Sequence, residues 1–319
     1  MPLSSNSAIT PSTIGVSPTL RLFLEKKLLT RLVPKFVHVK DGYTRGIPAG
    51  NGKTISFRRR NHLNPTTASS YALTEGTTPS ALTPSTDEIQ IAVTQYGGWI
   101  DAYDVADLIS YDDLMAADLE DLGDFNGQVL DISVRENLVT GTNVVRAGGR
   151  TSRGAVTSTD YLDDTTLKKA VTFLRNKNVP TFPDGTYHCI LPSLAMNDLF
   201  ATDAWKYPGF YQDAQSIRMG KISQLYGITF MDSSLAKVFT GAGASSIDVY
   251  SGVVYGPGAY GVPNLPGLDQ KVIIKPVGSS GSADPLNQRG SRGTKASMGS
   301  SILDQNKIIR LEFAVSYAG

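Results

Sequence analysis

The pattern of apolar and polar positions is most regular near the C-terminal end of the chain. The alternating apolar positions are Ile309, Leu311, Phe313, Val315 and Tyr317, with Arg310, Glu312, Ala314 and Ser316 between them. Such alternation is typical of a strand with one buried and one solvated face. Because Asp304-Gln305-Asn306 forms a turn signal just before it, the pattern predicts a hairpin with this segment as its second strand.

A second regular pattern predicts one long helix from Asp112 to Leu138. Its apolar positions follow the helical period and are Met115, Leu119, Leu122, Val129, Leu130, Val134 and Leu138. Asp112 and Asp113 lie in the first turn, where the helix dipole favours acidic residues. The helix would be about 40 Å long. Gly123 and Gly127 each cost up to about 1 kcal/mol in a helix interior, so the sequence also allows a bend or break there.

A long hairpin is predicted ahead of this helix. Residues 53–58 and 89–94 alternate apolar with polar side chains, and Asn51-Gly52 is a turn signal. The stretch between them, 65–86, is rich in Thr, Ser, Ala and Pro. Each half could reach about 60 Å, whereas a compact chain of this length is about 50 Å across. A lone two-stranded ribbon is marginal in water, so we expect the hairpin to lie on a neighbouring subunit.

Residues 157–262 alternate predicted helices and strands, which indicates one α/β unit. Asp163-Asp164 begins a helix with Leu167, Ala170, Val171 and Leu174 on its inner face. Strands are predicted at 187–191, 225–230 and 247–254, and a second helix runs from Pro192 through Phe200. Another strand is predicted at 271–277, followed by a region of Gly and Ser turns.

The first 50 residues are expected to form an arm. Ser17-Pro18 is a helix start signal, and a short helix is predicted through about Leu32, before Pro34. The N-terminal stretch lacks the basic and apolar blocks of a signal peptide, and no apolar run reaches membrane-spanning length. The single cysteine, Cys189, suits a reducing cytoplasm. The sequence therefore favours an intracellular protein without a membrane partner.

Charge is strongly segregated although the formal net charge is only +1. Residues 1–60 hold 11 Lys and Arg against two acids, and residues 61–134 hold 13 acids and no Lys or Arg. The basic arm could fold over the acidic middle of its own chain or dock on that of the next copy. The reach of the hairpin favours the second interpretation. The candidate intersubunit residues are Arg58, Arg59, Arg60, Asp112, Asp113, Asp118, Glu120 and Asp121.

Enzyme chemistry finds little support in the sequence. Gly50-Asn51-Gly52-Lys53-Thr54 suggests a phosphate loop, but the first glycine of the motif is missing and a strand follows where a helix should begin. The three histidines are scattered, and His188-Cys189 in an apolar strand is better explained by core packing than by a catalytic pair. The acidic run from Asp101 lacks the EF-hand loop pattern. We therefore expect no catalytic residue, metal or cofactor.

Several segments together resemble the HK97-like major capsid proteins of tailed phages, in particular a podophage branch. They are Lys53-Thr-Ile-Ser-Phe-Arg-Arg-Arg60, Glu75-Gly-Thr-Thr-Pro79, Gln95-Tyr-Gly-Gly-Trp99, Gly220-Lys-Ile-Ser-Gln-Leu-Tyr-Gly227 and Asp284-Pro-Leu-Asn-Gln-Arg-Gly290, followed by Gly293 and Lys295. The similarity runs in order over nearly the whole chain.

The resemblance implies an α+β fold with five parts. They are an N-terminal arm (1–52), an extended hairpin called the E-loop (53–98), a P-domain with a long spine helix (99–156), an inserted A-domain (157–262) and the C-terminal strands of the P-domain (263–319). The implied function is a major capsid protein that assembles into the icosahedral shell around the double-stranded DNA of a tailed phage.

The resemblance also implies partners and a location. Copies would form hexamers and pentamers, with a separate scaffolding protein, a portal protein, a possible cement or decoration protein, and packaged DNA bound without sequence specificity. Assembly would take place in the host bacterial cytoplasm, and the product would be the virion capsid. Some relatives cross-link their shells through an E-loop lysine. Residues 61–134 contain no lysine, so no such cross-link is expected.

Two other classes of protein remain open at this stage. A compartment shell of the encapsulin type would share the fold and hold protein cargo in place of DNA. A β-rich tail or adhesin component would instead form trimers or rings. An enzyme would need a pocket with convergent titratable groups, which the sequence does not indicate.

Overall fold

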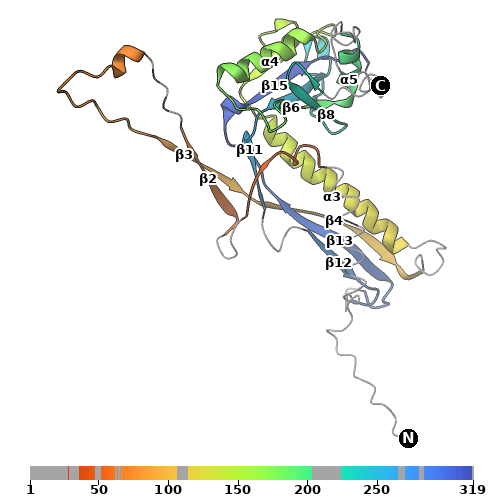
Figure 1. Cartoon of the computed structure of the whole chain (residues 1–319). Helices are drawn as coiled ribbons and strands as arrows, with labels where there is room; N and C mark the ends of the chain where they lie inside the picture. The colour runs from red at the N-terminus through yellow and green to blue at the C-terminus, as the bar shows by residue number, and fades with distance from the viewer. Residues whose placement is uncertain are drawn as a thin grey trace.

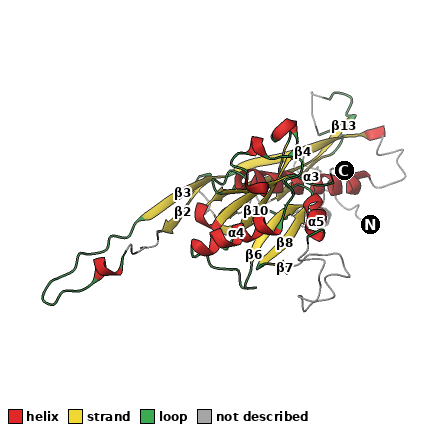
Figure 2. Ribbon diagram, turned by 90° about the horizontal axis from the view of Figure 1, so that it is seen from above, coloured by secondary structure: helices red, strands yellow, loops and turns green. Residues whose placement is uncertain are grey.

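The structure is a computed structural model that describes residues 28, 36–46, 52–61, 63, 65, 67–105, 114–202, 224–264, 270–279 and 284–317. Figures 1 and 2 show three parts: a rounded α/β body, an elongated arm, and a hairpin that projects away from both. The predicted helix from Ser17 to Leu32 lies outside the described residues except for Leu28, which is helical and buried against the arm.

The α/β body is built on a seven-stranded sheet in the order β5-β15-β10-β6-β8-β7, with β9 paired to β10. Its strands are β5 (Val144–Arg146), β6 (Tyr187–Pro192), β7 (Gln224–Leu225), β8 (Ile228–Ser233), β9 (Val238–Phe239), β10 (Val249–Tyr255) and β15 (Ile308–Phe313). Helices α4 (Asp164–Asn176) and α5 (Ser193–Phe200) pack on one face. The predicted helices and the strand at 187–191 are confirmed, and the Asp163 carboxylate caps α4 by accepting from the Thr166 N–H.

One predicted strand is divided by a tight turn. Residues 225–230 were expected to be continuous, but β7 ends at Leu225 and β8 begins at Ile228. Tyr226 and Gly227 between them have φ values of +54° and +78°. Two successive residues with positive φ form the two-residue turn that best joins antiparallel strands. The segment is therefore a hairpin.

The predicted C-terminal hairpin is wrong in its pairing. The turn is present, with the Asp304 carboxylate accepting from the Asn306 N–H, but the short strand before it, β14 (Ser301–Ile302), pairs with β11 (Tyr260–Asn264). β15 instead enters the body sheet between β10 and β5. Both of its faces are covered there, so Glu312 and Ala314, expected on a solvated face, are buried.

The elongated arm, which is a different part of the molecule from the predicted N-terminal arm (1–52), consists of one long helix on a three-stranded sheet. Helix α3 (Leu114–Leu138) runs through Gly123 and Gly127 without a break. Strands β12 (Gln270–Lys275), β13 (Arg289–Met298) and β4 (Thr94–Tyr103) form the sheet in that order. Strand β13 falls in the region that the sequence indicated as Gly and Ser turns, which corrects that expectation. The C-terminal half of α3 also covers the second face of the body sheet.

The projecting hairpin consists of β2 (Thr54–Arg60) and β3 (Thr86–Ala92), paired with Thr54 opposite Ala92 and Arg60 opposite Thr86. This confirms the predicted antiparallel pairing. Its base lies against a small sheet formed by β1 (Tyr43–Gly46), β11 and β14. Ile55, Phe57, Ile91 and Val93 are buried there and pack on Leu303.

Candidate intersubunit surface

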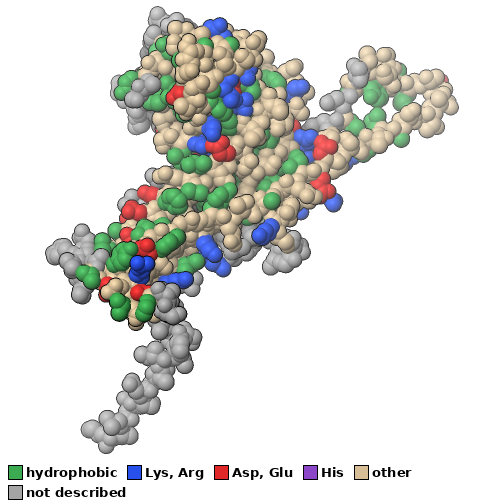
Figure 3. Space-filling model, turned by 180° about the vertical axis from the view of Figure 1, so that it is seen from behind, with side chains coloured by type: hydrophobic (Ala, Val, Ile, Leu, Met, Phe, Trp, Pro, Cys, Tyr) green, Lys and Arg blue, Asp and Glu red, His purple; other side chains and the backbone are tan. Residues whose placement is uncertain are grey.

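The loop between β2 and β3 is not buried against any other described part of its own chain. Every described side chain from 67 to 88 is exposed, and Figure 3 shows apolar side chains on this projection. Tyr71 is 50%, Leu73 is 77% and Leu82 is 58% exposed. Apolar side chains that gather on an exposed segment often mark a protein-protein contact. This loop is therefore the first candidate for contact with another subunit.

Arg59 fixes the base of the hairpin within its own chain. Its guanidinium pairs with Asp87 on β3 (2.7 Å) and with Asp304 in the turn before β15 (2.9 Å). The contact with Arg59 lowers the pKa of the Asp87 carboxyl. Its neighbours Arg58 and Arg60 are exposed. Of the predicted basic contacts, Arg59 thus has partners in its own chain, whereas Arg58 and Arg60 face solvent.

The acidic candidates likewise include a residue that is paired within its own chain and a residue that faces solvent. Asp118 on α3 forms an ion pair with Arg292 on β13, so it binds the helix to its own sheet. Asp121 is exposed and Glu120 is half-buried. Asp112 and Asp113 lie outside the described residues. Arg59 and Asp118 thus pair with other residues of their own chain and stabilise the subunit itself.

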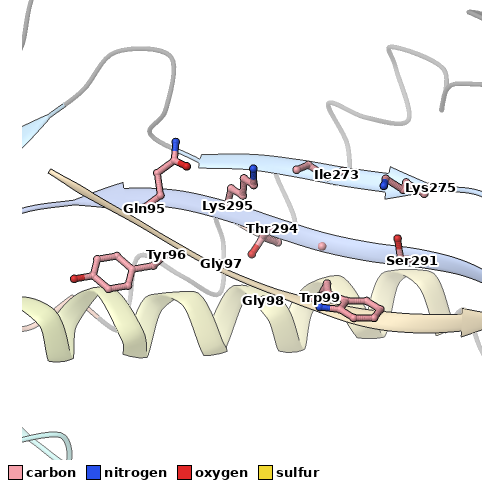
Figure 4. Close-up of a pocket in the computed structure, with 11 residues that line it drawn as sticks. Gln95, Tyr96, Gly97, Gly98, Trp99, Ile273, Lys275, Ser291, Thr294 and Lys295 are labelled. Carbon is pink, nitrogen blue, oxygen red and sulfur yellow. The ribbon is translucent and has the colours of Figure 1, made fainter. Parts of the chain in front are cut away.

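The sheet of the arm has one open face (Figure 4). Even-numbered residues of β4 point to α3: the Tyr96 hydroxyl is 2.9 Å from the Ser133 hydroxyl, and Gly98 lies against Phe125. Odd-numbered residues point away and are exposed, including Trp99, whose side chain is 66% exposed. An open hollow of about 690 Å³ lies on this face. It is a second candidate contact surface, which the sequence did not indicate.

No model of a protein family matches the sequence, and no curated protein matches it. Solved structures do. The capsid of cyanophage Pam1 has a TM-score of 0.69 at 13% identity, covering 91% of this chain and 93% of that one. The capsid of Ralstonia phage GP4 has a TM-score of 0.67 at 14% identity, covering 89% and 93%. The capsid of cyanophage P-SCSP1u has a TM-score of 0.64 at 16% identity, covering 86% and 87%.

This chain has the HK97-like capsid fold. At these identities the likeness shows the fold, and the expectation of an α+β capsid fold is confirmed. The β2–β3 hairpin with its loop is the segment that the sequence predicts to be the E-loop, and α3 is the helix that it predicts to be the spine.

A strap, residues 36–46, fastens the start of the described chain to the spine helix. The Asp131 carboxylate of α3 is fully buried and accepts from the backbone N–H groups of Val37 (2.9 Å) and His38 (2.7 Å). Its second oxygen is 2.6 Å from His38 Nδ1. An unpaired carboxylate buried this deeply would be strongly unfavourable. Asp131 therefore holds the strap on the HK97-like core at a defined position.

The strap is also fastened to the body sheet. Asp41 accepts from the Tyr255 hydroxyl (2.9 Å) and lies 2.7 Å from His188 Nδ1. The other ring nitrogen of His188 is 3.1 Å from Asp184. Partial burial raises the pKa of Asp184, but hydrogen bonds from Thr186 and His188 outweigh this and lower it to about 2. His188 was predicted to be a packed core residue and is instead a polar link, with its ring stacked on Phe182.

Three arginines converge on one buried glutamate on β15 of the body sheet. Glu312 on β15 is fully buried and pairs with Arg146 (2.7 Å), Arg153 (2.6 Å) and Arg310 (3.0 Å). Burial alone raises the pKa of Glu312, but the arginines outweigh it and lower the pKa overall. The cluster joins two distant stretches of the sequence, one with Arg146 and Arg153 and the other with Arg310 and Glu312, so no local signal could have revealed it.

Among the described residues, no group of three or more His, Cys, Asp or Glu side chains could hold a metal ion. Cys189 is fully buried, and burial raises the pKa of its thiol, which disfavours the reactive thiolate. None of the described helices has the length and apolar character needed to cross a bilayer.

Proposed function

We propose that this chain is the major capsid protein of a tailed phage and that it assembles into the icosahedral shell enclosing the double-stranded DNA genome. The observation that supports this most is the E-loop. On a capsid fold, it extends far from its own subunit with apolar side chains exposed. A loop that cannot be buried by its own chain gains its stabilisation from a neighbour.

The proposal includes the division of the chain and its partners. The N-terminal arm would be residues 1–52, the E-loop 53–98, the P-domain 99–156 and 263–319, and the A-domain 157–262. Strand β15 lies in the same sheet as the A-domain strands, so the two domains share one core near the C-terminal end. Copies would form hexamers and pentamers, with a scaffolding protein, a portal, a possible cement protein and non-specifically bound DNA. The role is structural and not enzymatic.

Expression with the scaffolding protein of the same phage tests this function. Negative-stain microscopy should show closed shells, and particles taken from virions should contain DNA protected from nuclease. Shells that hold protein cargo and no DNA would point to a compartment. Trimers or open rings without shells would point to a tail component.

Assembly should depend on the exposed arginines of the E-loop base. Each exposed ion pair is worth about 0–1 kcal/mol, so Arg58→Gln with Arg60→Gln should weaken the contact between subunits by about tenfold or more at low salt. Light scattering at 50 mM and 500 mM salt measures this, and the difference between variant and parent should shrink at high salt.

The matched control for this pair is Lys169→Gln with Lys177→Gln, which removes the same charge from exposed positions on and just after α4. Equal assembly rates for the two double variants would contradict a specific role of Arg58 and Arg60. Arg59 is left unchanged because it holds the hairpin base in its own chain.

Mature shells should contain no lysine–asparagine cross-links, because residues 61–134 lack lysine altogether and Lys53 lies at the base of the hairpin, not on the projecting loop. Capsids boiled in detergent should run as a single band at 34.2 kDa. A ladder of covalent oligomers would overturn this. In shells without cross-links, the strength of the shell rests on non-covalent overlap or on cement proteins.

A further inference from the structure

The arginine cluster around Glu312 belongs to a larger network that carries an excess of positive charge. The Arg153 guanidinium stacks on the Phe239 ring, with Cζ 3.4 Å from the ring centroid, and Lys237 Nζ lies 5.9 Å from the same centroid. Lys237 also pairs with Glu136 (2.9 Å), which pairs with a basic neighbour on α3. This basic network has five basic and two acidic side chains: Arg135, Arg146, Arg153, Lys237, Arg310, Glu136 and Glu312.

Two guanidinium nitrogens of the basic network have no acceptor in the described part of the chain. Arg146 donates from Nε to Glu312 (2.7 Å) and from Nη1 to the Thr151 carbonyl (2.9 Å), so Nη2 is left over. Arg153 donates from Nε (3.0 Å) and Nη2 (2.6 Å) to Glu312, so Nη1 is left over. Their side chains are 18% and 30% exposed. Both arginines therefore keep a donor for a partner from outside the chain.

Buried polar atoms of the same region also lack a partner. Ser251 on β10 lies directly opposite Glu312 on β15, so the two side chains are on the same face of the sheet. The Ser251 hydroxyl is buried and has no hydrogen-bond partner among the described residues, and the same holds for Nε of Arg135. Buried polar groups in proteins are nearly always paired. The basic network is therefore short of acceptors as well as of negative charge.

The excess of positive charge also acts on Arg310. Burial lowers the pKa of its guanidinium, and the charges of Arg153 and Arg146 lower it further, so the pKa stays below its ordinary value although Glu312 raises it. An anion beside these arginines would relieve the repulsion. Guanidinium groups bind phosphate through parallel N–H bonds. A free phosphate carries about −1.5 to −2 charges at pH 7, and a nucleic-acid backbone supplies one charge per phosphate in series. Either neutralises more of the excess than a single carboxylate does.

We propose that the basic network binds a phosphate group, which accepts hydrogen bonds from Arg146 Nη2 and Arg153 Nη1. Free inorganic phosphate and the backbone of a nucleic acid both offer this group. The site goes beyond the proposed function, because a shell can assemble without a phosphate contact at a defined position. Loss of the site would therefore leave the proposed function standing.

Chemical modification of the full-length subunit tests the site. Phenylglyoxal reacts with accessible guanidinium groups, and mass spectrometry of the peptides follows each arginine separately. With inorganic phosphate near saturation, at an ionic strength held constant with sodium chloride, modification of Arg153 should slow by about tenfold. Arg175, an exposed arginine in the last turn of α4, should react at an unchanged rate. No slowing at Arg153, or equal slowing at both arginines, would overturn the proposal.

A short DNA duplex and poly-glutamate are the further probes. Protection of Arg153 by the duplex at a lower phosphate concentration than inorganic phosphate needs would assign the site to a nucleic-acid backbone. Protection by inorganic phosphate alone would assign it to free phosphate, and both results support the proposal. Protection by poly-glutamate alone would identify a partner that carries carboxylates, and equal protection by all three probes would show charge screening. Either of these last two results overturns the proposal.

A conservative double variant separates hydrogen bonding from charge. Arg146→Lys with Arg153→Lys keeps both positive charges near Glu312 but removes the planar fork of N–H donors. Phosphate should raise the unfolding temperature of the parent by about 2–4 °C and that of the variant by less than half as much. The matched control, Arg175→Lys with Arg289→Lys, makes the same change at exposed positions and should respond like the parent. An equal rise in all three proteins would contradict the site. If the double variant does not fold, the modification rates of the parent decide.

Discussion

Removal of residues Asn64–Thr83 from the E-loop is expected to abolish shell assembly while the rest of the subunit stays folded. Every described side chain in this stretch is exposed, so its loss removes no core contact. The buried base of the hairpin, Ile55, Phe57, Ile91 and Val93, remains. The unfolding temperature of the monomer should therefore change little, and light scattering with scaffold present should show no shells.

A less drastic variant separates loop chemistry from loop length. Tyr71→Ser, Leu73→Ser and Leu82→Ser keep the chain length and remove the large apolar side chains of the loop. This triple variant should also fail to assemble. Shells of normal yield from it would mean that the loop acts through its backbone alone.

The same interpretation makes a prediction about motion. In an assembly-blocked monomer, backbone amides from 68 to 81 should exchange with solvent within seconds, since few local hydrogen bonds protect them. In the shell they should be protected. Strong protection of this stretch in the monomer would show that the loop packs on its own subunit, and the overlap between copies would lose its basis.

Substitution of Glu312 by alanine should destabilise the subunit severely. Arg146, Arg153 and Arg310 would lose the carboxylate that they share. Removing one side of a buried ion pair typically costs about 3–5 kcal/mol, and total stabilities are about 5–15 kcal/mol. We expect a fall in unfolding temperature of about 5–8 °C by calorimetry, or loss of expression.

The control for this variant is Glu136→Ala. Glu136 also pairs with two basic residues, Arg135 and Lys237, but its side chain is 43% exposed. Solvent screens such pairs, so the cost should be within about 1 kcal/mol. Equal losses for the two variants would refute the importance of burial at Glu312. Because the pKa of Glu312 is lowered in the folded state, its stabilisation should be present above its ordinary pKa and lost as the pH falls through the lowered value.

Local periodicity was sufficient to predict the elements that are defined by a single apolar face or by a single turn. Helix α3 was predicted from apolar spacing and α4 from its Asp163 cap, because helical contacts lie three or four residues apart in the same segment. The E-loop hairpin was predicted from two alternating strands, and its reach from its length alone. The sequence was therefore sufficient to predict the exposed loop of the candidate site.

Strand β13 shows where periodicity fails. Its residues Arg289–Met298 include two glycines and few large apolar side chains, so the segment was interpreted as turns. The glycines are there because neighbouring backbone comes close: a methyl group on Gly290 would lie 2.9 Å from the Lys275 carbonyl oxygen. The need for glycine is set by the strands on either side, which the sequence of β13 does not contain.

The amino-acid sequence by itself determined the elements with a clear local period, such as α3 and α4, the segregation of charge and the long exposed loop, since each depends on residues close together in the chain. The tertiary structure alone decided which distant partners meet. It paired β15 with β10 and β5, formed the ion pairs of Arg59 with Asp304 and of Asp118 with Arg292, and buried Glu312 among three arginines. Strand pairing and ion pairing between distant segments leave no local period, because each partner is selected by the folded geometry of the whole chain.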